Sequence, residues 1–285
     1  MPEGDTIFRS ARTLNRALAG KAITGFRSTY ALLTRFHDNA PLTGQTIERV
    51  ESRGKWLLMH FSGGGILATH MLMNGSWHIY RPGEQWQLPA SAMRIVLETD
   101  DFVAVAFNVP IAEMHTPQSL ARDKRIPPPT SDILRDGFDP GAAVERLLGC
   151  GDVELGDALL RQRVLAGVGN VFKSEICFSA GLNPFCKVGS LTREQASEIV
   201  SIARWQLASN VLEDSGDRIV TYRGRRRRTT HESDPRESLW VYARRGQPCR
   251  RCGEPIRRRL QGAAARATYW CPRCQPMPDG CNIDG

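Results

Sequence analysis

Two Cys-x-x-Cys pairs near the C-terminus constrain the fold of this chain more than any other feature. The pairs are Cys249–Cys252 and Cys271–Cys274, and 18 residues separate them. Each pair can form a tight turn that points both sulfurs inward, and two such turns complete a tetrahedral thiolate site for one Zn²⁺. Since 18 mostly polar residues cannot hold a hydrophobic core, metal binding would supply much of the folding free energy of this region. Two disulfides are the alternative, and they are typical of secreted proteins.

The cysteine-rich region is also the basic part of the chain. Its arginines are Arg250, Arg251, Arg257, Arg258, Arg259, Arg266 and Arg273. The whole chain has a net charge of +8, but residues 218–274 contain 16 arginines, no lysine and four acidic residues. This segment therefore carries +12 and leaves −4 for the rest of the chain. A positive charge concentrated in this way is typical of proteins that bind a polyanion such as nucleic acid.

The sequence has no feature of a membrane or exported protein. No apolar run approaches the length of a membrane span, and the N-terminal residues lack the basic and apolar parts of a signal peptide. We therefore expect a cytoplasmic protein without a membrane partner, in which reduced cysteines can serve as metal ligands. The other four cysteines show no metal spacing and are expected to be free thiols: Cys150, Cys177, Cys186 and Cys281.

The N-terminal part of the chain reads as one helix followed by short strands. Residues 5–18 repeat apolar side chains at helical spacing, Asp5 can cap the start, and Gly20 can end the helix. Period-two and continuous apolar runs predict strands over 56–61, 65–73, 76–80, 94–99 and 102–107. Asn74-Gly75 predicts a β-hairpin between the second and third of these. Several short strands at this spacing predict a β-sandwich packed against the helix.

The pattern changes after a proline-rich segment. Residues 126–131, Ile-Pro-Pro-Pro-Thr-Ser, cannot continue a helix or a sheet and are predicted to be an interdomain linker. Helical spacing follows over 142–148, 153–164, 171–180 and 193–211. Thr192 and Gln195 form a capping box for the last of these helices.

Three polar motifs have both a functional and a structural interpretation. The glycines before Asn170 can offer bare backbone N–H groups to an anion, or form a tight turn between two helices with Asn170 as the cap. The arginine run 225–228 can bind a polyanion or be a solvated loop. Lys55 projects from a turn between strands and can be a catalyst or a surface charge. The histidines show no metal-ligand spacing, and we find no Ser/His/Asp order and no Walker-type loop.

Six stretches, in this order along the chain, resemble the formamidopyrimidine-DNA glycosylase and endonuclease VIII family of base-excision repair enzymes. They are Met1-Pro-Glu-Gly4, Arg53-Gly-Lys55, His70-Met-Leu-Met-Asn-Gly75, Ala166-Gly-Val-Gly-Asn170, Val241-Tyr242 with Gly246-Gln-Pro-Cys249, and Arg266-Ala-Thr-Tyr-Trp-Cys271. The resemblance extends over nearly the whole chain. It implies damaged DNA as the partner, one structural Zn²⁺, no organic cofactor, and a monomer.

The resemblance implies a catalytic role for residues at the N-terminus. Pro2 matches the proline that becomes the nucleophile once Met1 is removed, and Glu3 matches the neighbouring general acid. Lys55 matches the lysine that assists catalysis and β-elimination. The positive end of the helix that begins near Asp5 should lower the pKa of the Pro2 amine, which keeps a neutral, nucleophilic fraction. Without the resemblance, Pro2 and Glu3 would simply start a helix.

The resemblance also implies a DNA-binding role for five residues. Asn170 matches the phosphate-binding residue of a helix–two-turn–helix motif. Arg266 matches a zinc-finger arginine that binds phosphate beside the lesion and is assigned to δ-elimination. Leu72, Met73 and Asn74 match the turn that fills the gap left by an everted base, although Met73 could instead pack in the sheet.

The expected fold is therefore α+β and multidomain. We expect an N-terminal helix with a catalytic β-sandwich over 1–125 and a linker over 126–131. A helical DNA-binding domain with a helix–two-turn–helix motif and the arginine-rich loop is expected over 132–240. A β-hairpin zinc finger with a C-terminal tail should occupy 241–285.

Two departures from the family pattern bear on specificity. Thr6 stands where the family commonly has glutamate, and residues 107–114 lack the Asp-Pro-Arg-Arg-Phe-Gly segment of the purine-type branch. The absence of this segment and the sequence of the N-terminus both resemble the endonuclease VIII branch, which prefers oxidised pyrimidines. The alternatives are purine specificity of the formamidopyrimidine type, a member that acts only on abasic sites, and a non-enzymatic zinc-ribbon protein that binds nucleic acid.

Overall fold

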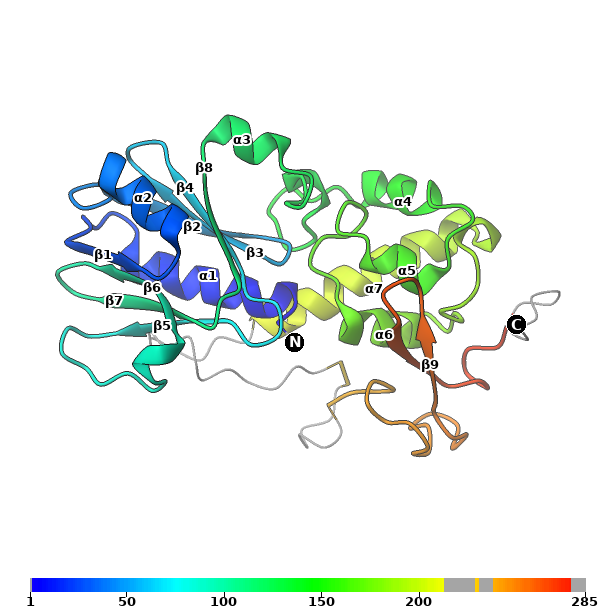
Figure 1. Cartoon of the computed structure of the whole chain (residues 1–285). Coiled ribbons are helices and arrows are strands. Elements are labelled where there is room, and N and C mark those ends of the chain that lie inside the picture. The colour runs from blue at the N-terminus through cyan, green and yellow to red at the C-terminus, as the bar shows by residue number, and fades with distance from the viewer. Residues whose placement is uncertain (1, 213–228, 231–237, 278–285) are drawn as a thin grey trace. The chain divides into compact units, whose positions relative to one another are not determined.

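The computed structural model describes residues 2–212, 229–230 and 238–277 (Figure 1). The chain divides into two compact units with a boundary between Pro128 and Pro129, which we call the first and the second unit. The predictions that concern Met1, the arginine run 225–228 and Cys281 lie outside the described residues. In the described part of the chain, no helix is long and apolar enough to cross a membrane.

In its described residues, the first unit is a β-sandwich of two four-stranded antiparallel sheets with three α-helices (Figure 1). One sheet has the strand order β1 (Gly25–Ser28), β6 (Met93–Glu98), β7 (Val103–Phe107) and β5 (Ser76–Tyr80). The other has the order β2 (Ile47–Arg53), β3 (Trp56–Phe61), β4 (Ile66–His70) and β8 (Ile111–His115). The helices are α1 (Gly4–Leu18), α2 (Ala31–Asn39) and α3 (Pro117–Arg122).

The core of the first unit explains the composition of its strands. Side chains from α1 and from both sheets form one buried apolar cluster, which includes Leu14, Leu57 and Trp77. Every residue of β3 is buried, because its other face packs against Leu120 of α3 and against Ile126. This second layer explains why residues 56–61 read as a continuous apolar run rather than as an alternating strand.

The predicted sandwich is confirmed, and so is the pairing of β6 with β7. The hairpin predicted at Asn74-Gly75 is wrong. Strand β4 ends at His70 and pairs with β3 and β8, whereas β5 pairs with β7 in the other sheet. Residues 71–75 are therefore a tight turn that crosses between the two sheets. Helix α2 lies inside the region predicted as strands.

Helix α1 confirms the predicted N-terminal helix, with a correction at its start. The N-cap residue is Glu3, and Asp5 lies buried in the first turn rather than capping it. The helix ends as predicted, since Gly20 has a φ of 79° and can leave the helical path without strain.

The second unit contains four α-helices and a β-hairpin within its described residues. The helices are α4 (Pro140–Leu148), α5 (Leu155–Leu160), α6 (Asn170–Ser179) and α7 (Arg193–Leu212). The hairpin pairs β9 (Arg257–Gln261) with β10 (Arg266–Trp270) in antiparallel register. The helix predicted over 153–164 is too long, because turns replace it after Leu160. The capping box of Thr192 and Gln195 is confirmed, with reciprocal bonds of 2.9 and 3.2 Å.

Candidate functional site

The N-terminal residues lie at the start of α1. The backbone carbonyl of Glu3 accepts hydrogen bonds from the N–H groups of Thr6 and Ile7 at 3.0 and 3.1 Å, which makes Glu3 the N-cap. Its side chain is fully buried, and Pro2 is half-buried immediately before it. The aligned backbone dipoles of α1 give this end of the helix a partial positive charge.

Helix α1 runs antiparallel to β2, which brings its start level with Lys55. The N–H of Gly20 donates to the carbonyl of Ile47 at 2.8 Å, and the N–H of Val50 donates to Asn15 Oδ1 at 2.7 Å. From Asn15 to the start of α1 is about 17 Å at 1.5 Å per helical residue. From Val50 to Lys55 is also about 17 Å at 3.3 Å per strand residue. The two segments therefore reach the same end of the sandwich.

The turn between β2 and β3 holds Lys55 at that end. Arg53 pairs with Trp56 across the turn, so only Gly54 and Lys55 connect the strands. Gly54 has a φ of 60°, as the first position of a type II′ turn requires. Lys55 is half-buried. The two-residue turn leaves its backbone little freedom.

His70 lies beside Lys55, and no specific role was predicted for it from the sequence. Trp56 pairs with His70 across β3 and β4, so the residue before Trp56 is next to the imidazole. Burial lowers the pKa of His70 to about 4, and the charge of Lys55 acts in the same direction. The neutral ring accepts a hydrogen bond from the N–H of Leu72 through Nδ1 at 3.2 Å. The only sequence signal was its place at the start of the segment 70–75.

The turn at 71–75 presents two large apolar side chains to solvent. Met71 is 2% exposed and anchors the turn in the core, whereas Leu72 is 44% and Met73 61% exposed. The N–H of Gly75 donates to the carbonyl of Met71 at 2.8 Å. A Cβ on Gly75 would lie 2.6 Å from that oxygen, so the turn requires glycine there. Leu72 has a φ of 45°, which is uncommon for a branched residue and marks a constrained turn.

The structure shows the surroundings of the two departures from the family pattern. The connection between β7 and β8 is only three residues, Asn108 to Pro110, and leaves no room for a longer inserted segment. The N–H of Asn108 donates to the carbonyl of Ala92 at 2.8 Å, which fixes this short connection. Thr6 is half-buried, and its hydroxyl donates to Asp5 Oδ1 at 3.3 Å.

In the second unit, α5 and α6 are joined by two turns that Gln162 organises. Its Nε2 donates to the carbonyls of Leu160 and Val168 at 2.8 and 3.0 Å, and its Oε1 accepts from the N–H of Gly167 at 3.1 Å. Gly167 has a φ of 104°, which only glycine adopts readily. Glutamine in a turn carries no distinctive sequence signal, so Gln162 could not be identified from the sequence. The loop ends at the N-terminus of α6, and the positive end of a helix attracts anions.

Asn170 is the first residue of α6 and not its cap, which is Gly169. Its side chain is buried, and Nδ2 donates to the carbonyl of Ala267 at 2.9 Å. Within the described residues, Oδ1 has no hydrogen-bond partner. The bond to Ala267 brings the start of α6 next to the start of β10, where Arg266 is exposed. The structure thus places Asn170 and Arg266 close together although they are distant in the chain.

A chain of buried hydrogen bonds fastens the β9–β10 hairpin to α5 and α6. Lys173 Nζ donates to the hydroxyl of Thr268 at 2.6 Å, and that hydroxyl donates to Gln261 Oε1 at 2.7 Å. Gln261 Nε2 in turn donates to Glu154 Oε2 at 2.8 Å. The network links α6, both strands of the hairpin and the start of α5, so it holds the strand that carries Arg266 in one orientation.

A second buried group, Glu175, holds the segment that precedes the cysteines. Its carboxylate is fully buried and accepts the backbone N–H groups of Trp240, Val241 and Tyr242 at 2.8 to 2.9 Å, together with the hydroxyl of Thr229. These four hydrogen bonds compensate the free-energy cost of removing the carboxylate from water. Glu175, like Lys173, could not be identified from the sequence, because the partners of both are distant in the chain.

The four cysteines converge as the spacing predicted. The sulfurs of Cys249 and Cys274 lie 3.9 Å apart, those of Cys252 and Cys271 lie 3.4 Å apart, and all four fall within 4.8 Å of one another. Two thiolates bound to one zinc at about 2.3 Å are separated by about 3.8 Å in a tetrahedron. The set therefore fits a zinc ion, and the sulfurs are too far apart for the alternative of two disulfides.

The structure places the candidate residues in two groups, one in each unit. Pro2, Glu3, Lys55 and the turn at 71–75 lie at one end of the first unit. Asn170, Arg266 and the four cysteines belong to the second unit, where the cysteines and Arg266 share the finger and Asn170 contacts its strand β10. The first group holds a carboxyl and an ammonium group, and removal of Met1 would add the secondary amine of Pro2. The second group holds polar and basic groups suited to an anion, and four thiols suited to a metal ion.

Comparison with known proteins finds matches to both the N-terminal and the C-terminal part of the chain. Residues 1–110 match the family described as the formamidopyrimidine-DNA glycosylase N-terminal domain, and residues 246–276 match a zinc finger found in FPG and IleRS. "Probable endonuclease 8 2" of Streptomyces coelicolor is 38% identical over 98% of this chain and 95% of its own length. The "DNA-(apurinic or apyrimidinic site) lyase Nei2" of Mycolicibacterium smegmatis is 35% identical over 96% of this chain and 99% of its own length.

Solved structures with the same fold are also found. The Lactococcus lactis Fpg protein, in complex with DNA that contains an abasic site, superposes with a TM-score of 0.77. The alignment covers 96% of this chain and 100% of that protein at 22% sequence identity. At this identity the similarity shows the fold alone.

Proposed function

The chain belongs to the formamidopyrimidine-DNA glycosylase and endonuclease VIII family, and from this premise we propose that it is a bifunctional DNA glycosylase and abasic-site lyase of base excision repair. It excises oxidised bases, chiefly pyrimidines, through an imine formed with Pro2, and then cleaves the strand by β- and δ-elimination. Relatives named as endonucleases and as a lyase match this chain over nearly its full length. Their matches argue against the non-enzymatic zinc-ribbon alternative.

One observation carries the proposal. Pro2 and Glu3 begin α1 at the end of the sandwich where Lys55, His70 and the exposed turn at 71–75 also lie. A structural role at a helix start needs no such neighbours. A lesion site needs an amine nucleophile, an acid, a cation for the phosphate, and an apolar group to replace the extruded base. Residues at this end can supply all four, which supports the proposal.

The Pro2 amine starts the reaction. Once Met1 is removed, its nitrogen attacks C1′ of the damaged nucleoside, the glycosidic bond breaks, and the base leaves with the bonding electrons. The departing base takes up the proton that the Pro2 nitrogen loses, and Glu3 gives a proton to the ring oxygen of the sugar. The C1′–O bond then breaks, which opens the ring and leaves a cationic imine between Pro2 and C1′. The positive end of α1 favours the neutral amine before attack.

The imine then drives strand cleavage. Its positive charge acidifies the C2′ proton, and loss of that proton breaks the C3′–O bond and releases the 3′ phosphate. A second elimination breaks the C5′–O bond and leaves a gap of one nucleoside. Lys55 neutralises phosphate charge in the first elimination and Arg266 in the second. His70, neutral at physiological pH, supports the turn that carries Leu72.

The turn at 71–75 takes the place of the extruded base. The base must leave the stack because C1′ cannot be reached inside a duplex. Met73 is the main wedge, since it is apolar, flexible and more exposed than Leu72, with Leu72 and Asn74 at its sides. The short β7–β8 connection leaves the opposite strand without an inserted loop, which supports pyrimidine specificity over purine specificity.

The second unit binds the phosphate backbone. The N-terminal amides of α6, with Asn170, and the exposed Arg266 offer positive charge on neighbouring elements. One zinc ion held by Cys249, Cys252, Cys271 and Cys274 is structural, because four thiolates leave no open position for water. The protein is expected to act on DNA as a cytoplasmic monomer without an organic cofactor.

Borohydride trapping on oligonucleotides with thymine glycol, 8-oxoguanine or an abasic site tests the proposal. Wild-type protein should give a covalent adduct, with thymine glycol ahead of 8-oxoguanine. Pro2→Gly, or a form that retains Met1, should lose nearly all trapping. Glu3→Gln should block base release and still cleave a preformed abasic site. Normal trapping by protein with Met1 attached would refute the proline mechanism and make Lys55 the leading nucleophile.

A further inference from the structure

Three metal-binding side chains converge beside α3, at a place that the proposed chemistry does not use. Glu113 and His115 are two residues apart on β8, so their side chains point to the same face of the sheet. Asp123 is the C-cap residue of α3. One ligand atom from each of the three lies within 4.8 Å of the others. His115 pairs with Ile66, at the end of β4 opposite His70, so this cluster is remote from the lesion site.

His115 is the feature that points to a ligand. Its side chain is only 8% exposed, yet its Nε2 has no hydrogen-bond partner among the residues that the structure describes. Nε2 lies 3.5 Å from Glu113 Oε2. The other ring nitrogen, Nδ1, lies 3.3 Å from the hydroxyl of Ser119, which also belongs to the capping box of α3. The ring is therefore oriented by one nitrogen and directs the other into the cluster, as in a metal-binding histidine.

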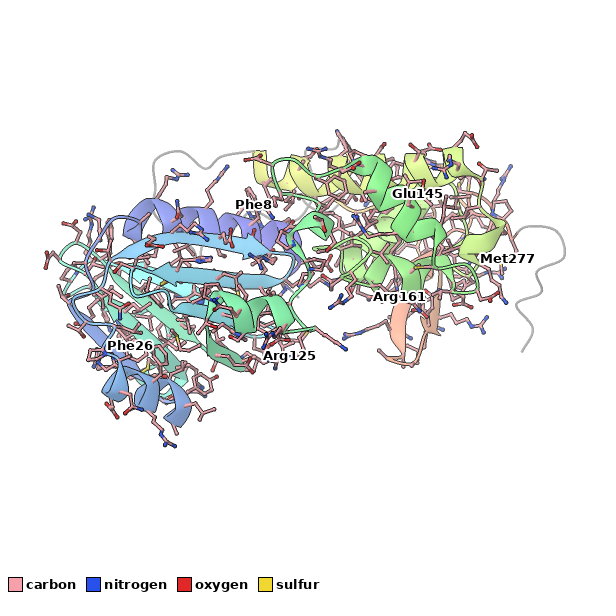
Figure 2. The ribbon with its side chains drawn as sticks, turned by 90° about the horizontal axis from the view of Figure 1, so that it is seen from above. Phe8, Phe26, Arg125, Glu145, Arg161 and Met277 are labelled. Atoms are coloured by element: carbon pink, nitrogen blue, oxygen red, sulfur yellow. The ribbon has the colours of Figure 1, made fainter. Side chains whose placement is uncertain are left out.

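Arg125 shows that this place already attracts a cation (Figure 2, beside α3). Its Nη2 lies 2.5 Å from Glu113 Oε2 and 2.6 Å from Asp123 Oδ2, so one nitrogen bridges both carboxylates. Further contacts involve the other two oxygens: Nη1 donates to Glu113 Oε1 at 2.9 Å, and the backbone N–H donates to Asp123 Oδ1 at 2.8 Å. Since the Arg125 side chain is half-exposed, its guanidinium group can turn into solvent. Asp123, whose side chain is only 10% exposed, would then need another cation to compensate its charge.

We propose that Glu113, His115 and Asp123 form a second metal site, which binds one divalent transition-metal ion of the zinc class. The ion takes the place of Arg125 Nη2 between the two carboxylates and adds His115 Nε2 as its nitrogen ligand. Ligand atoms at about 2.0–2.2 Å from zinc stand about 3.4 Å apart in a tetrahedron, close to the 3.5 Å between His115 Nε2 and Glu113 Oε2. One imidazole and two carboxylates suit zinc better than the hard cations Mg²⁺ and Ca²⁺.

The bound ion would join β8 to the segment after α3. A site with three protein ligands leaves one position for water, so the ion would exchange more readily than one held by four cysteine thiolates. Its effect is to stabilise the first unit increasingly as free zinc rises. This role does not depend on the proposed glycosylase activity.

Calorimetric titration of zinc into protein whose four-cysteine site is already loaded tests the proposal. Wild-type protein should take up one further ion per chain. His115→Ala should weaken this binding roughly tenfold or more, as loss of a ligand does. Arg125→Gln should strengthen it about fivefold, because a competing cation worth about 1 kcal/mol is removed. This substitution keeps the backbone N–H that donates to Asp123 and the carbonyl that accepts from the indole of Trp56.

Asp101→Asn is the control, since Asp101 is an ion-paired carboxylate of the first unit outside the cluster. It should bind zinc as the wild type does. Melting curves with and without added zinc check that the His115 variant is folded, and a second variant, His115→Gln, should also lose the zinc-dependent rise in Tm. No uptake by the wild type, equal uptake by His115→Ala, or weaker uptake by Arg125→Gln would each overturn the proposal.

Discussion

Neighbouring residues of the turn at 71–75 have opposite environments, and this difference decides their roles. Met71 is buried and Met73 is exposed, although both are methionines two positions apart. In a continuing strand they would point to the same side. The sharp turn at Leu72, with its positive φ, separates them. The buried methionine therefore fixes the turn, and the exposed one is accessible for the wedge role that we propose.

Met73→Ala should slow base excision from duplex DNA about tenfold, because the wedge replaces part of the few kcal/mol of lost stacking. Cleavage of an abasic site in single-stranded DNA should change by less than about twofold, since no stack is opened there. Leu32→Ala is the control, because Leu32 is an exposed leucine on α2 in the same unit. Single-turnover rates on both substrates check the prediction, and equal losses on both would contradict a wedge.

Arg266→Ala should remove one phosphate contact. The slope of log Kobs against log salt concentration should fall by about 0.9, through the loss of one released counterion. Arg81→Ala is the control, because Arg81 lies just past the end of β5 that is away from the turn at 71–75, and it should leave the slope unchanged.

Cys271→Ser should weaken DNA binding at least as much as Arg266→Ala, because loss of the zinc disorders the strand that carries Arg266. Fluorescence titrations at several salt concentrations measure both effects, and an unchanged slope for Arg266→Ala would exclude it from the phosphate site.

At the level of elements, the β9–β10 hairpin is positioned by close contact with α5. A Cβ on Gly156 would lie 2.3 Å from Gln261 Oε1, and a Cβ on Gly262 would lie 2.4 Å from Asp157 Oδ1. Two glycines, one on each side of the contact, allow the hairpin to approach the helix. The approach lets Gln261 reach both Thr268 and Glu154. Packing and the buried polar network therefore act together to orient β10.

Gly156→Ala should destabilise the second unit by about 1–3 kcal/mol, the usual cost of overpacking. It should also weaken DNA binding, because displacement of Gln261 disturbs the strand that begins at Arg266. Gly141→Ala in α4 is the matched control, since its Cβ would come no closer than 3.3 Å to any neighbouring atom. Urea midpoints of both variants check the prediction. Equal stability for the two variants would show that the close contact is not required.

For the whole molecule, acid should act mainly on the first unit. Burial lowers the pKa of His78 to about 4 from its ordinary value of 6.5, and the pKa of His70 is lowered to a similar value. Burial acts to raise the pKa of Glu51, but the bond to His60 and the charges of nearby arginines together outweigh it and lower this pKa to about 2. Groups with lowered pKa values stabilise the fold at high pH. The histidine contribution is complete above pH 6.5 and declines as the pH falls toward 4, and that of Glu51 declines below about 4.5.

His78→Gln should reduce this pH dependence. In the wild type, protonation linked to His78 should lower the free energy of unfolding by about 1 kcal/mol when the pH falls from about 7.5 to about 5.0. This figure allows for solvent screening. The variant is less stable at the higher pH, because His78 bonds both Ser76 and Tyr80, but its stability should change less between the two pH values. Urea unfolding at the two pH values measures the difference. A pH dependence identical to that of the wild type would refute the assignment.

The features that the sequence determined by itself are those set by neighbours in the chain. The spacing of the four cysteines predicted that their sulfurs converge, apolar spacing predicted α1, and the residues flanking Asp100 predicted the β6–β7 pair. A capping box and a Cys-x-x-Cys turn need only a few consecutive residues, so their chemistry is visible in the sequence. The family motifs in chain order added the catalytic and DNA-binding candidates.

Only the tertiary structure decided which sheet each strand joins and which distant groups meet. Asn74-Gly75 has the composition of a hairpin turn, but β4 and β5 find better partners in separate sheets. Contacts such as Asn170 with Ala267 join residues far apart in the chain. Such contacts leave no local pattern, because they depend on how whole elements pack and not on the order of neighbouring residues. For the same physical reason, the cluster around His115 became visible only once β8 and α3 were placed side by side.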